Sequence, residues 1–223
     1  MTETMNPAAA STLKVLVFGA SLRADSLNHT LAALAARLAE QHGAVVDRAS
    51  LRDFDVPLYD GDAEKVEGIP KGAEEFRRRL VECDAFIISS PEYNGSMPGV
   101  LKNLIDWTSR FRPQPFDGKQ GLLMSASPSM SGGNRGLWSL RVPFEHLGAR
   151  LYPDMFSLAQ AHKALVEDDI ADAALRARFD KNLQAFLSLA EAAKHYPCIK
   201  RAWVEFLGQP PDPAADRVDP VTA

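Results

Sequence analysis

Short apolar runs alternate with longer amphipathic stretches along the chain, and this alternation restricts the fold more than any other feature of the sequence. The run at 13–19 is nearly continuous in Val, Leu and Phe, which is typical of a strand covered on both faces. Further strands are expected at 44–50, 84–90, 118–127 and 149–157. Five strands separated by helical segments predict an α/β fold with a parallel sheet and right-handed crossovers.

Helices are expected between the strands. The segment 26–41 carries Leu27, Leu31, Leu34 and Leu38 at helical spacing. The other expected helices cover 71–83, 98–110, 135–147 and 169–194, with a last short helix at 199–207 and a long surface loop at 51–68. For five such strands the order 2-1-3-4-5 is favoured, and ligands then bind beyond the strand C-termini, between strands 1 and 3.

Charge and cysteine content exclude several function classes. The 223 residues fit one α/β domain, and the net charge of -4 argues against a nucleic-acid partner. No apolar run reaches the roughly 18 residues of a membrane span, so no membrane partner is expected. The cysteines, Cys83 and Cys198, lack the spacing of a metal site or a disulfide framework. This composition predicts a cytoplasmic protein without a metal site.

The two ends of the chain differ from its middle. Residues 1–12 lack the features of a signal peptide, and we expect them to form a disordered lead-in. The main domain is expected at 13–197 and a C-terminal extension at 198–223, whose tail is rich in proline and acid. Trp203 and Phe206 in this extension could pack on a neighbouring subunit or on the domain's own core.

Four polar side chains crowd the junction between the first strand and the helix after it, namely Ser21, Arg23, Ser26 and Asn28. A helix N-terminus presents unpaired N–H groups and the positive end of the helix dipole, so it is a ready anion site. Hydroxyl, amide and guanidinium donors at this point suit a terminal monophosphate. In the alternative interpretation Ser26 or Asp25 only caps the helix, and Arg23 is solvated.

The segment 19–28 resembles the Gly-Ser-x-Arg-x-x-Ser-x-Asn signature of the NADPH-dependent FMN reductases. Ala20 stands where that signature usually has glycine. That family includes NAD(P)H:quinone reductases, azoreductases and chromate-reducing flavoproteins. The resemblance covers residues 13–190 and implies a flavodoxin-like three-layer sandwich that binds FMN. The implied cofactor-binding residues of this first loop are Ser21, Arg23, Ser26, Leu27 and Asn28.

The segment 91–107 resembles the same family's Pro-Glu-Tyr-Asn-x-x-x-Pro-x-x-x-Lys-Asn-x-x-Asp-Trp motif. Asn94-Gly95 is a strong turn signal, and backbone N–H groups in such a turn can bond the O4 and N5 edge of a flavin. The alternative is a plain turn followed by a helix. Asn103 and Trp107 share a helix face, and we interpret them as packing residues at a possible subunit contact. The expected cofactor-binding residues here are Pro91, Glu92, Tyr93, Asn94 and Gly95.

A third loop, at 125–135, is rich in hydroxyls and glycine and resembles the family's Ser-Pro-Gly-x-x-Gly-Gly-x-Arg loop, with Ser129 in place of a glycine. Ser127 is the expected contact to the flavin edge, and a solvent loop without a ligand is the alternative. No acid–base arrangement is apparent, so no catalytic side chain is assigned. Glu92 could donate a proton or could be a charged group at the pocket rim, and the five scattered histidines are expected to be structural or solvated.

These features predict an FMN-dependent oxidoreductase in which the cofactor carries the chemistry. NADPH or NADH would pass a hydride to the flavin, and a small acceptor would then take the electrons. Quinones, azo compounds, metal oxyanions and free flavin are the acceptors considered. The resemblance further implies a homodimer or homotetramer. The alternatives are an electron carrier without its own NAD(P)H oxidation and a flavin-sensing interaction module.

Overall fold

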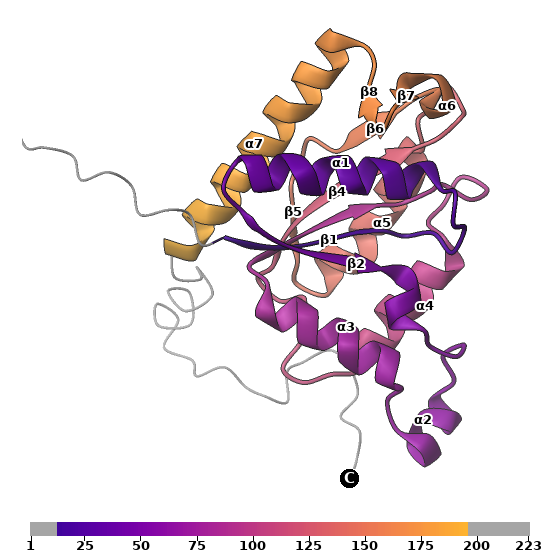
Figure 1. Cartoon of the computed structure of the whole chain (residues 1–223). Coiled ribbons are helices and arrows are strands. Elements are labelled where there is room, and N and C mark those ends of the chain that lie inside the picture. The colour runs from indigo at the N-terminus through magenta and orange to yellow at the C-terminus, as the bar shows by residue number, and fades with distance from the viewer. Residues whose placement is uncertain (1–12, 196–223) are drawn as a thin grey trace, which may run out of the picture.

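A parallel sheet crosses the middle of the molecule in the computed structural model, which describes residues 13–195 (Figure 1). Its strands follow the order β2-β1-β3-β4-β5, and β6 also pairs with β4. The predicted order is therefore confirmed. The strands are β1 (Lys14–Gly19), β2 (Val45–Ser50), β3 (Ala85–Ser89), β4 (Gln120–Ala126), β5 (Arg150–Leu151) and β6 (Phe156–Leu158).

Helices cover both faces of this sheet, as expected of a three-layer sandwich (Figure 1). One face packs on α1 (Leu27–Gln41) and α7 (Ala173–His195), and the other on α3 (Lys71–Glu82), α4 (Gly99–Thr108) and α5 (Asn134–His146). Successive strand side chains point to opposite faces. Val15 and Val17 accordingly join the core under α1 and α7, whereas Leu16 and Phe18 join the core on the other side.

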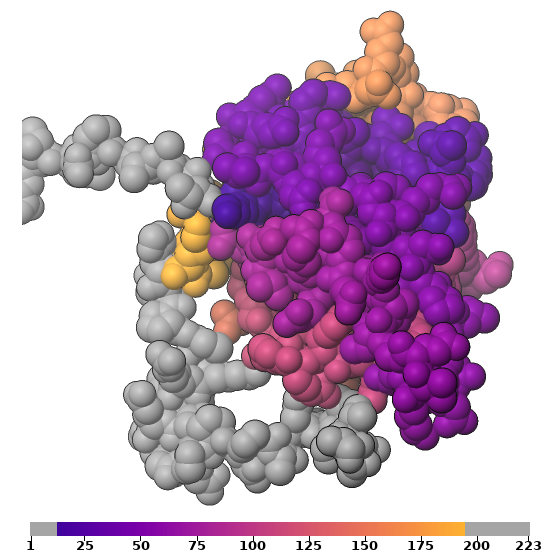
Figure 2. Space-filling view, turned by 60° about the horizontal axis from the view of Figure 1, so that its bottom comes forward, coloured from indigo at the N-terminus to yellow at the C-terminus, as the bar shows by residue number. Residues whose placement is uncertain are grey.

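The segment 51–68 is not the surface loop that the sequence predicts. It contains a 3-10 helix, η1 (Leu51–Phe54), and a short helix, α2 (Gly61–Glu67). Ser50 and Asp53 form a capping box that starts η1. Leu51 and Phe54 are buried, and the ring of Phe54 packs against Phe18. The helix α2 has no buried residue and stands out from the body of the molecule (Figures 1 and 2).

The prediction of a single strand at 149–157 is also wrong, because this segment forms two separate strands, β5 and β6. Pro153 lies between them and has no N–H to donate to a sheet ladder. The last helix begins at Ala173 instead of 169 because β8 (Asp169–Ile170) pairs with β7 (Leu165–Val166) in a hairpin that follows α6 (Ala161–Ala164).

The lead-in at 1–12, the extension at 198–223 and the helix at 199–207 lie outside the described residues, so these expectations stay predictions. None of the helices formed by residues 13–195 combines the length and apolar character that a bilayer-crossing segment needs.

Candidate functional site

Three loops meet at the carboxyl edge of the sheet, where β1, β3 and β4 end. Backbone bonds align the strand ends: Ala20 N–H donates to Ser89 O at 2.8 Å, and Ser90 N–H donates to Met124 O at 2.7 Å. The residues singled out in the sequence lie on or beside these loops. The fold therefore brings the three predicted ligand loops to one edge of the sheet, the edge at which doubly wound sheets bind ligands.

Asn28 connects the first helix to two strand ends. Its side chain is buried, and its Oδ1 accepts hydrogen bonds from Ser89 Oγ and from Ala126 N–H, both at 2.9 Å. Its Nδ2 donates to Ala126 O at 2.9 Å. The amide oxygen is thus fully engaged within the protein, and one N–H is left for a ligand. The side chain that the sequence suggested as a phosphate ligand holds the site together.

The two buried hydroxyls of the first loop accept backbone hydrogen bonds. Ser26 caps α1, with its Oγ accepting from Asn28 N–H at 3.3 Å, and Ser21 Oγ accepts from Arg23 N–H at 3.2 Å. Each hydroxyl keeps its own proton available as a donor. Capping, the alternative interpretation of Ser26, is therefore present in the structure and is compatible with anion binding.

The backbone of this loop leaves donors for an anion. Within residues 13–195, five of its N–H groups have no hydrogen-bond partner, those of Ser21, Leu22, Ala24, Asp25 and Ser26. Unpaired amides at the start of a 15-residue helix are the donor set that a phosphate monoester requires. The residues present fit the phosphate of FMN.

Arg23 lies at the surface, away from any buried partner. Its guanidinium pairs with Asp25 at 3.2 Å, and the two side chains are 71% and 81% exposed. This is the solvated arrangement given above as an alternative. An ion pair this exposed contributes less than about 1 kcal/mol, so Arg23 can exchange Asp25 for a phosphate at little cost.

The loop after β3 forms a tight turn. Tyr93 and Ser96 exchange backbone hydrogen bonds of 2.9 and 3.0 Å, and Asn94 and Gly95 have φ values of 52° and 79°. Positive φ at both central residues explains the Asn-Gly pair. In the described chain the N–H groups of Asn94 and Gly95 have no protein partner, and the Tyr93 ring is half-exposed. The turn therefore offers two amides and an aromatic face to a planar ligand, with Pro91 at its start.

Glu92 connects this turn to the third loop and α5. One carboxylate oxygen accepts from the N–H groups of Arg135 (2.9 Å) and Gly136 (3.2 Å), and the other accepts from the Arg135 guanidinium at 2.6 and 2.9 Å. Burial acts to raise the pKa of Glu92, but these hydrogen bonds outweigh it and hold the pKa below its usual value. Glu92 is consequently an ionised cap of α5, which argues against a proton donor. Sequence reasoning did not connect it to Arg135.

The loop after β4 carries a row of hydroxyls. Ser127 Oγ lies 3.0 Å from Ser129 Oγ, which lies 2.9 Å from Ser131 Oγ. Gly133, at φ 85°, has no room for a side chain, because an added Cβ would lie 2.0 Å from Ser125 Oγ. Ser127 is partly exposed at this edge of the sheet, where it is accessible to a ligand.

The family motif's Asn103 and Trp107 share a helix face, as predicted, and pack within their own chain. Both donate to the carbonyl oxygen of Pro57 at 2.8 Å, and Asn103 Oδ1 accepts from Tyr59 N–H at 2.8 Å. The ring of Tyr59 packs edge-on against Trp107 at 4.9 Å. These contacts anchor the segment before α2 to α4.

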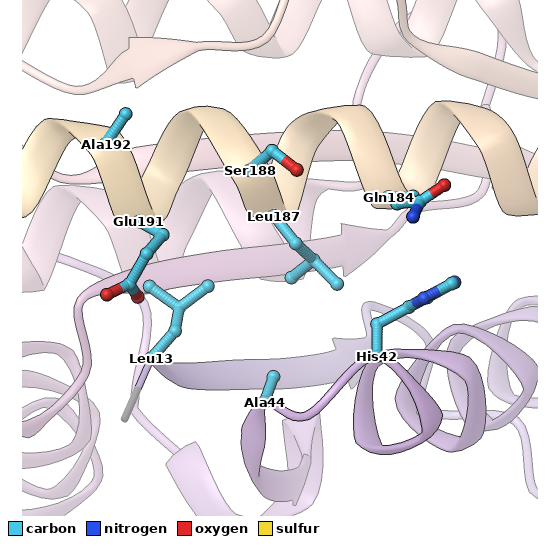
Figure 3. Close-up of a pocket in the computed structure, with 8 residues that line it drawn as sticks. All are labelled: Leu13, His42, Ala44, Gln184, Leu187, Ser188, Glu191 and Ala192. Carbon is cyan, nitrogen blue, oxygen red and sulfur yellow. The ribbon is translucent and has the colours of Figure 1, made fainter. Parts of the chain in front are cut away.

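A hollow of about 470 Å³ lies elsewhere on the described surface. It opens between α7, the end of α1 and the start of β1, with Leu13, His42, Leu187 and Glu191 around it (Figure 3). These residues belong to the amino edge of the sheet, opposite the three loops. No group of three or more His, Cys, Asp or Glu within residues 13–195 is arranged to hold a metal ion.

A doubly wound sheet with unpaired amides in the loop after β1 and in the turn after β3 is typical of nucleotide-binding α/β proteins. The family model of the NADPH-dependent FMN reductases matches residues 13–163. The chain therefore belongs to the NADPH-dependent FMN reductase family.

Individual relatives agree with this membership. A quinone reductase of Escherichia coli is 38% identical over 129 residues, which span 58% of this chain and 68% of the relative. An NAD(P)H-dependent FMN reductase of Pseudomonas aeruginosa is 40% identical over 132 residues, with the same shares of 58% and 68%. The solved structure of FerB, a flavoenzyme NAD(P)H:(acceptor) oxidoreductase from Paracoccus denitrificans, superposes with a TM-score of 0.69 at 27% identity, covering 82% of this chain and 99% of FerB.

These comparisons confirm the prediction of an enzyme over an electron carrier or a sensing module. The protein is an FMN-dependent NAD(P)H oxidoreductase with a flavodoxin-like fold.

Proposed function

We propose that this enzyme reduces quinones with NAD(P)H, holding the FMN phosphate in the loop after β1 and the flavin ring against the turn after β3. The observation that carries this proposal is the set of N–H groups in the loop at 21–26 that have no partner in the described chain, apart from that of Arg23, which donates to Ser21 Oγ. This set lies at the same sheet edge as the amides of Asn94 and Gly95. One set suits a phosphate dianion, and the other suits the electron-rich edge of a reduced flavin.

Bound FMN supplies the redox chemistry, since it can accept a hydride from NAD(P)H and deliver two electrons to an acceptor. The protein's part is to bind and orient. Ser21, Ser26 and the loop amides would hold the phosphate, with Arg23 added from the surface. Asn94 and Gly95 would donate their N–H groups to the ring, and Ser127 would contact it from the loop after β4. Glu92 keeps the second and third loops at a fixed separation through α5.

A quinone acceptor balances the reaction: NAD(P)H, a quinone and one proton give NAD(P)⁺ and a hydroquinone. Glu92 is ionised and already accepts four hydrogen bonds, so the proton comes from water at the open edge of the site. The half-exposed ring of Tyr93 offers a stacking surface for a planar acceptor. The relatives named as quinone reductases support the same choice.

We further propose a homodimer or homotetramer in the cytoplasm. Large apolar side chains on and before α5 are exposed, including Met130 at 75%, Trp138 at 58% and Val142 at 71%. Such side chains favour a protein contact. A mass measurement by light scattering during size exclusion tests the assembly, and a monomer at all concentrations would contradict it.

The function is tested with protein reconstituted with FMN under anaerobic conditions. Addition of NADH or NADPH should bleach the visible flavin band, and a water-soluble benzoquinone should restore it with formation of one hydroquinone per nicotinamide oxidised. Chromate and an azo dye are compared at equal concentration. Bleaching without reoxidation by the quinone, but with reoxidation by another acceptor, would refute the quinone assignment.

A further inference from the structure

Two basic side chains from other elements contact carbonyl oxygens of the loop at 21–25, which we call the phosphate loop. His29 Nε2 lies 2.9 Å from Ser21 O, and His29 Nδ1 lies 3.5 Å from Ala24 O. The guanidinium of Arg52, which belongs to η1, donates to Leu22 O. Three carbonyl groups of one short loop thus face two basic residues from other elements, α1 and η1. Because a carbonyl can only accept, Nε2 of His29 carries a proton here.

Holding a carbonyl also aims the next amide, because the peptide unit is planar and trans, so its C=O and N–H point in opposite directions. The bond from His29 to Ser21 O turns Leu22 N–H away from the histidine. Leu22 N–H is among the loop amides that lack a protein partner in the described chain. His29 therefore accounts directly for part of the donor set of the loop.

The position of the His29 ring is fixed by packing. A Cβ added to Gly19 would lie 2.5 Å from His29 Cδ2, so the ring rests on the backbone at the end of β1. The backbone of Arg52 is fixed by the capping box of η1, in which Ser50 Oγ accepts from Arg52 N–H at 3.2 Å. The His29 ring and the backbone of Arg52 are thus in place before any ligand binds.

We propose that His29 and Arg52 are positioning residues for the FMN phosphate: His29 turns Leu22 N–H toward the anion, and Arg52 holds the next peptide, whose N–H donates to Ser21 Oγ. The proposal rests on the proposed function and extends it to two residues outside the family signature. It makes a specific claim: the two residues contribute to recognition of the phosphate and contribute nothing to recognition of the flavin ring.

The test compares FMN with riboflavin, which has the same ring and no phosphate. Dissociation constants of both are measured by quenching of flavin fluorescence for the wild type and for His29→Phe and Arg52→Met. We expect each variant to weaken FMN by about 5- to 30-fold, as for loss of a hydrogen bond of roughly 1–2 kcal/mol, with riboflavin within about twofold. His29→Gln, whose Nε2–H can still donate to Ser21 O, should recover most of the FMN affinity.

A matched control separates loop positioning from charge. Arg48, on β2, lines a hollow of about 270 Å³ beside His29, and no hydrogen bond joins it to the loop in the described chain. Arg48→Met removes the same charge as Arg52→Met and should change FMN affinity much less. Equal losses in these two variants, or equal losses of FMN and riboflavin in His29→Phe, would overturn the proposal. If the wild type itself binds FMN no better than riboflavin, the phosphate site and the proposed function both fail.

Discussion

Replacing Glu92 with alanine should remove the hydrogen bonds that connect the turn after β3 to the first turn of α5. The wild-type carboxylate is buried, with its side chain 8% exposed, and accepts from two backbone N–H groups and from the Arg135 guanidinium. Gly133, the residue before α5, provides no side-chain cap of its own. The alanine variant therefore leaves the start of α5 without a capping side chain.

The size of the effect follows from these contacts. Loss of a helix cap costs about 0.5–2 kcal/mol, and the charge on this acceptor places the cost toward the upper end. The ion pair adds less than about 1 kcal/mol, because the Arg135 side chain is 69% exposed. We expect Glu92→Ala to lower the free energy of unfolding by about 2–3 kcal/mol. Arg135→Ala, which keeps both backbone bonds, should cost less than about 1 kcal/mol.

Urea unfolding followed by circular dichroism measures both variants, and the larger loss corresponds to a midpoint shift of about 1 M. The pH supplies a second check. The pKa of Glu92 is lowered in the folded protein, so its contribution is present above the usual value of 4.5 and is lost as the pH falls through the folded pKa. Equal costs for the two variants, or a Glu92→Ala cost that does not shrink in acid, would refute the capping role.

Three further outcomes are expected. Asp25→Asn frees Arg23 from its exposed ion pair and should strengthen FMN binding up to about fivefold at low salt, with the gain fading at high salt; titration of flavin fluorescence checks it. Asn28→Ala removes three buried hydrogen bonds and should lower the free energy of unfolding by about 2–4 kcal/mol in urea, whereas a loss below 1 kcal/mol would contradict the bridging role. Burial raises the pKa of Cys83 to about 11, so in a Cys198→Ser variant a disulfide reagent should label native protein at pH 8 only at the rate of unfolding; immediate labelling would be inconsistent with this.

The central strands could be predicted because burial on both faces leaves an uninterrupted apolar run, as in the buried segment Ala85–Ser89. The segment 51–68 could not, because Leu51 and Phe54 are its two buried apolar anchors among many charged residues, glycine and proline. The break in the fifth strand depends on Pro153, whose effect on pairing is visible only when the ladder to β4 is known.

The site could be located but not fully interpreted from sequence. Its loops follow apolar strands, and the family motifs identify them. Individual roles depend on contacts between distant residues: Glu92 meets Arg135 over 43 positions, and Asn28 meets Ala126 over 98. Nothing local indicates that the Asn28 amide faces two strand ends. The positioning function of His29 likewise depends on its ring lying beneath the loop at 21–24.

The bridge made by Asn28 has a consequence for how the enzyme meets its cofactor. Because one amide ties α1 to the ends of both β3 and β4, the relative positions of these three elements are set when the chain folds. Little of the backbone then has to become ordered when FMN binds, so the affinity is not reduced by a closing movement of the site. Empty and loaded enzyme should consequently share nearly the same backbone at this edge, and FMN lost during turnover could be regained without a conformational step.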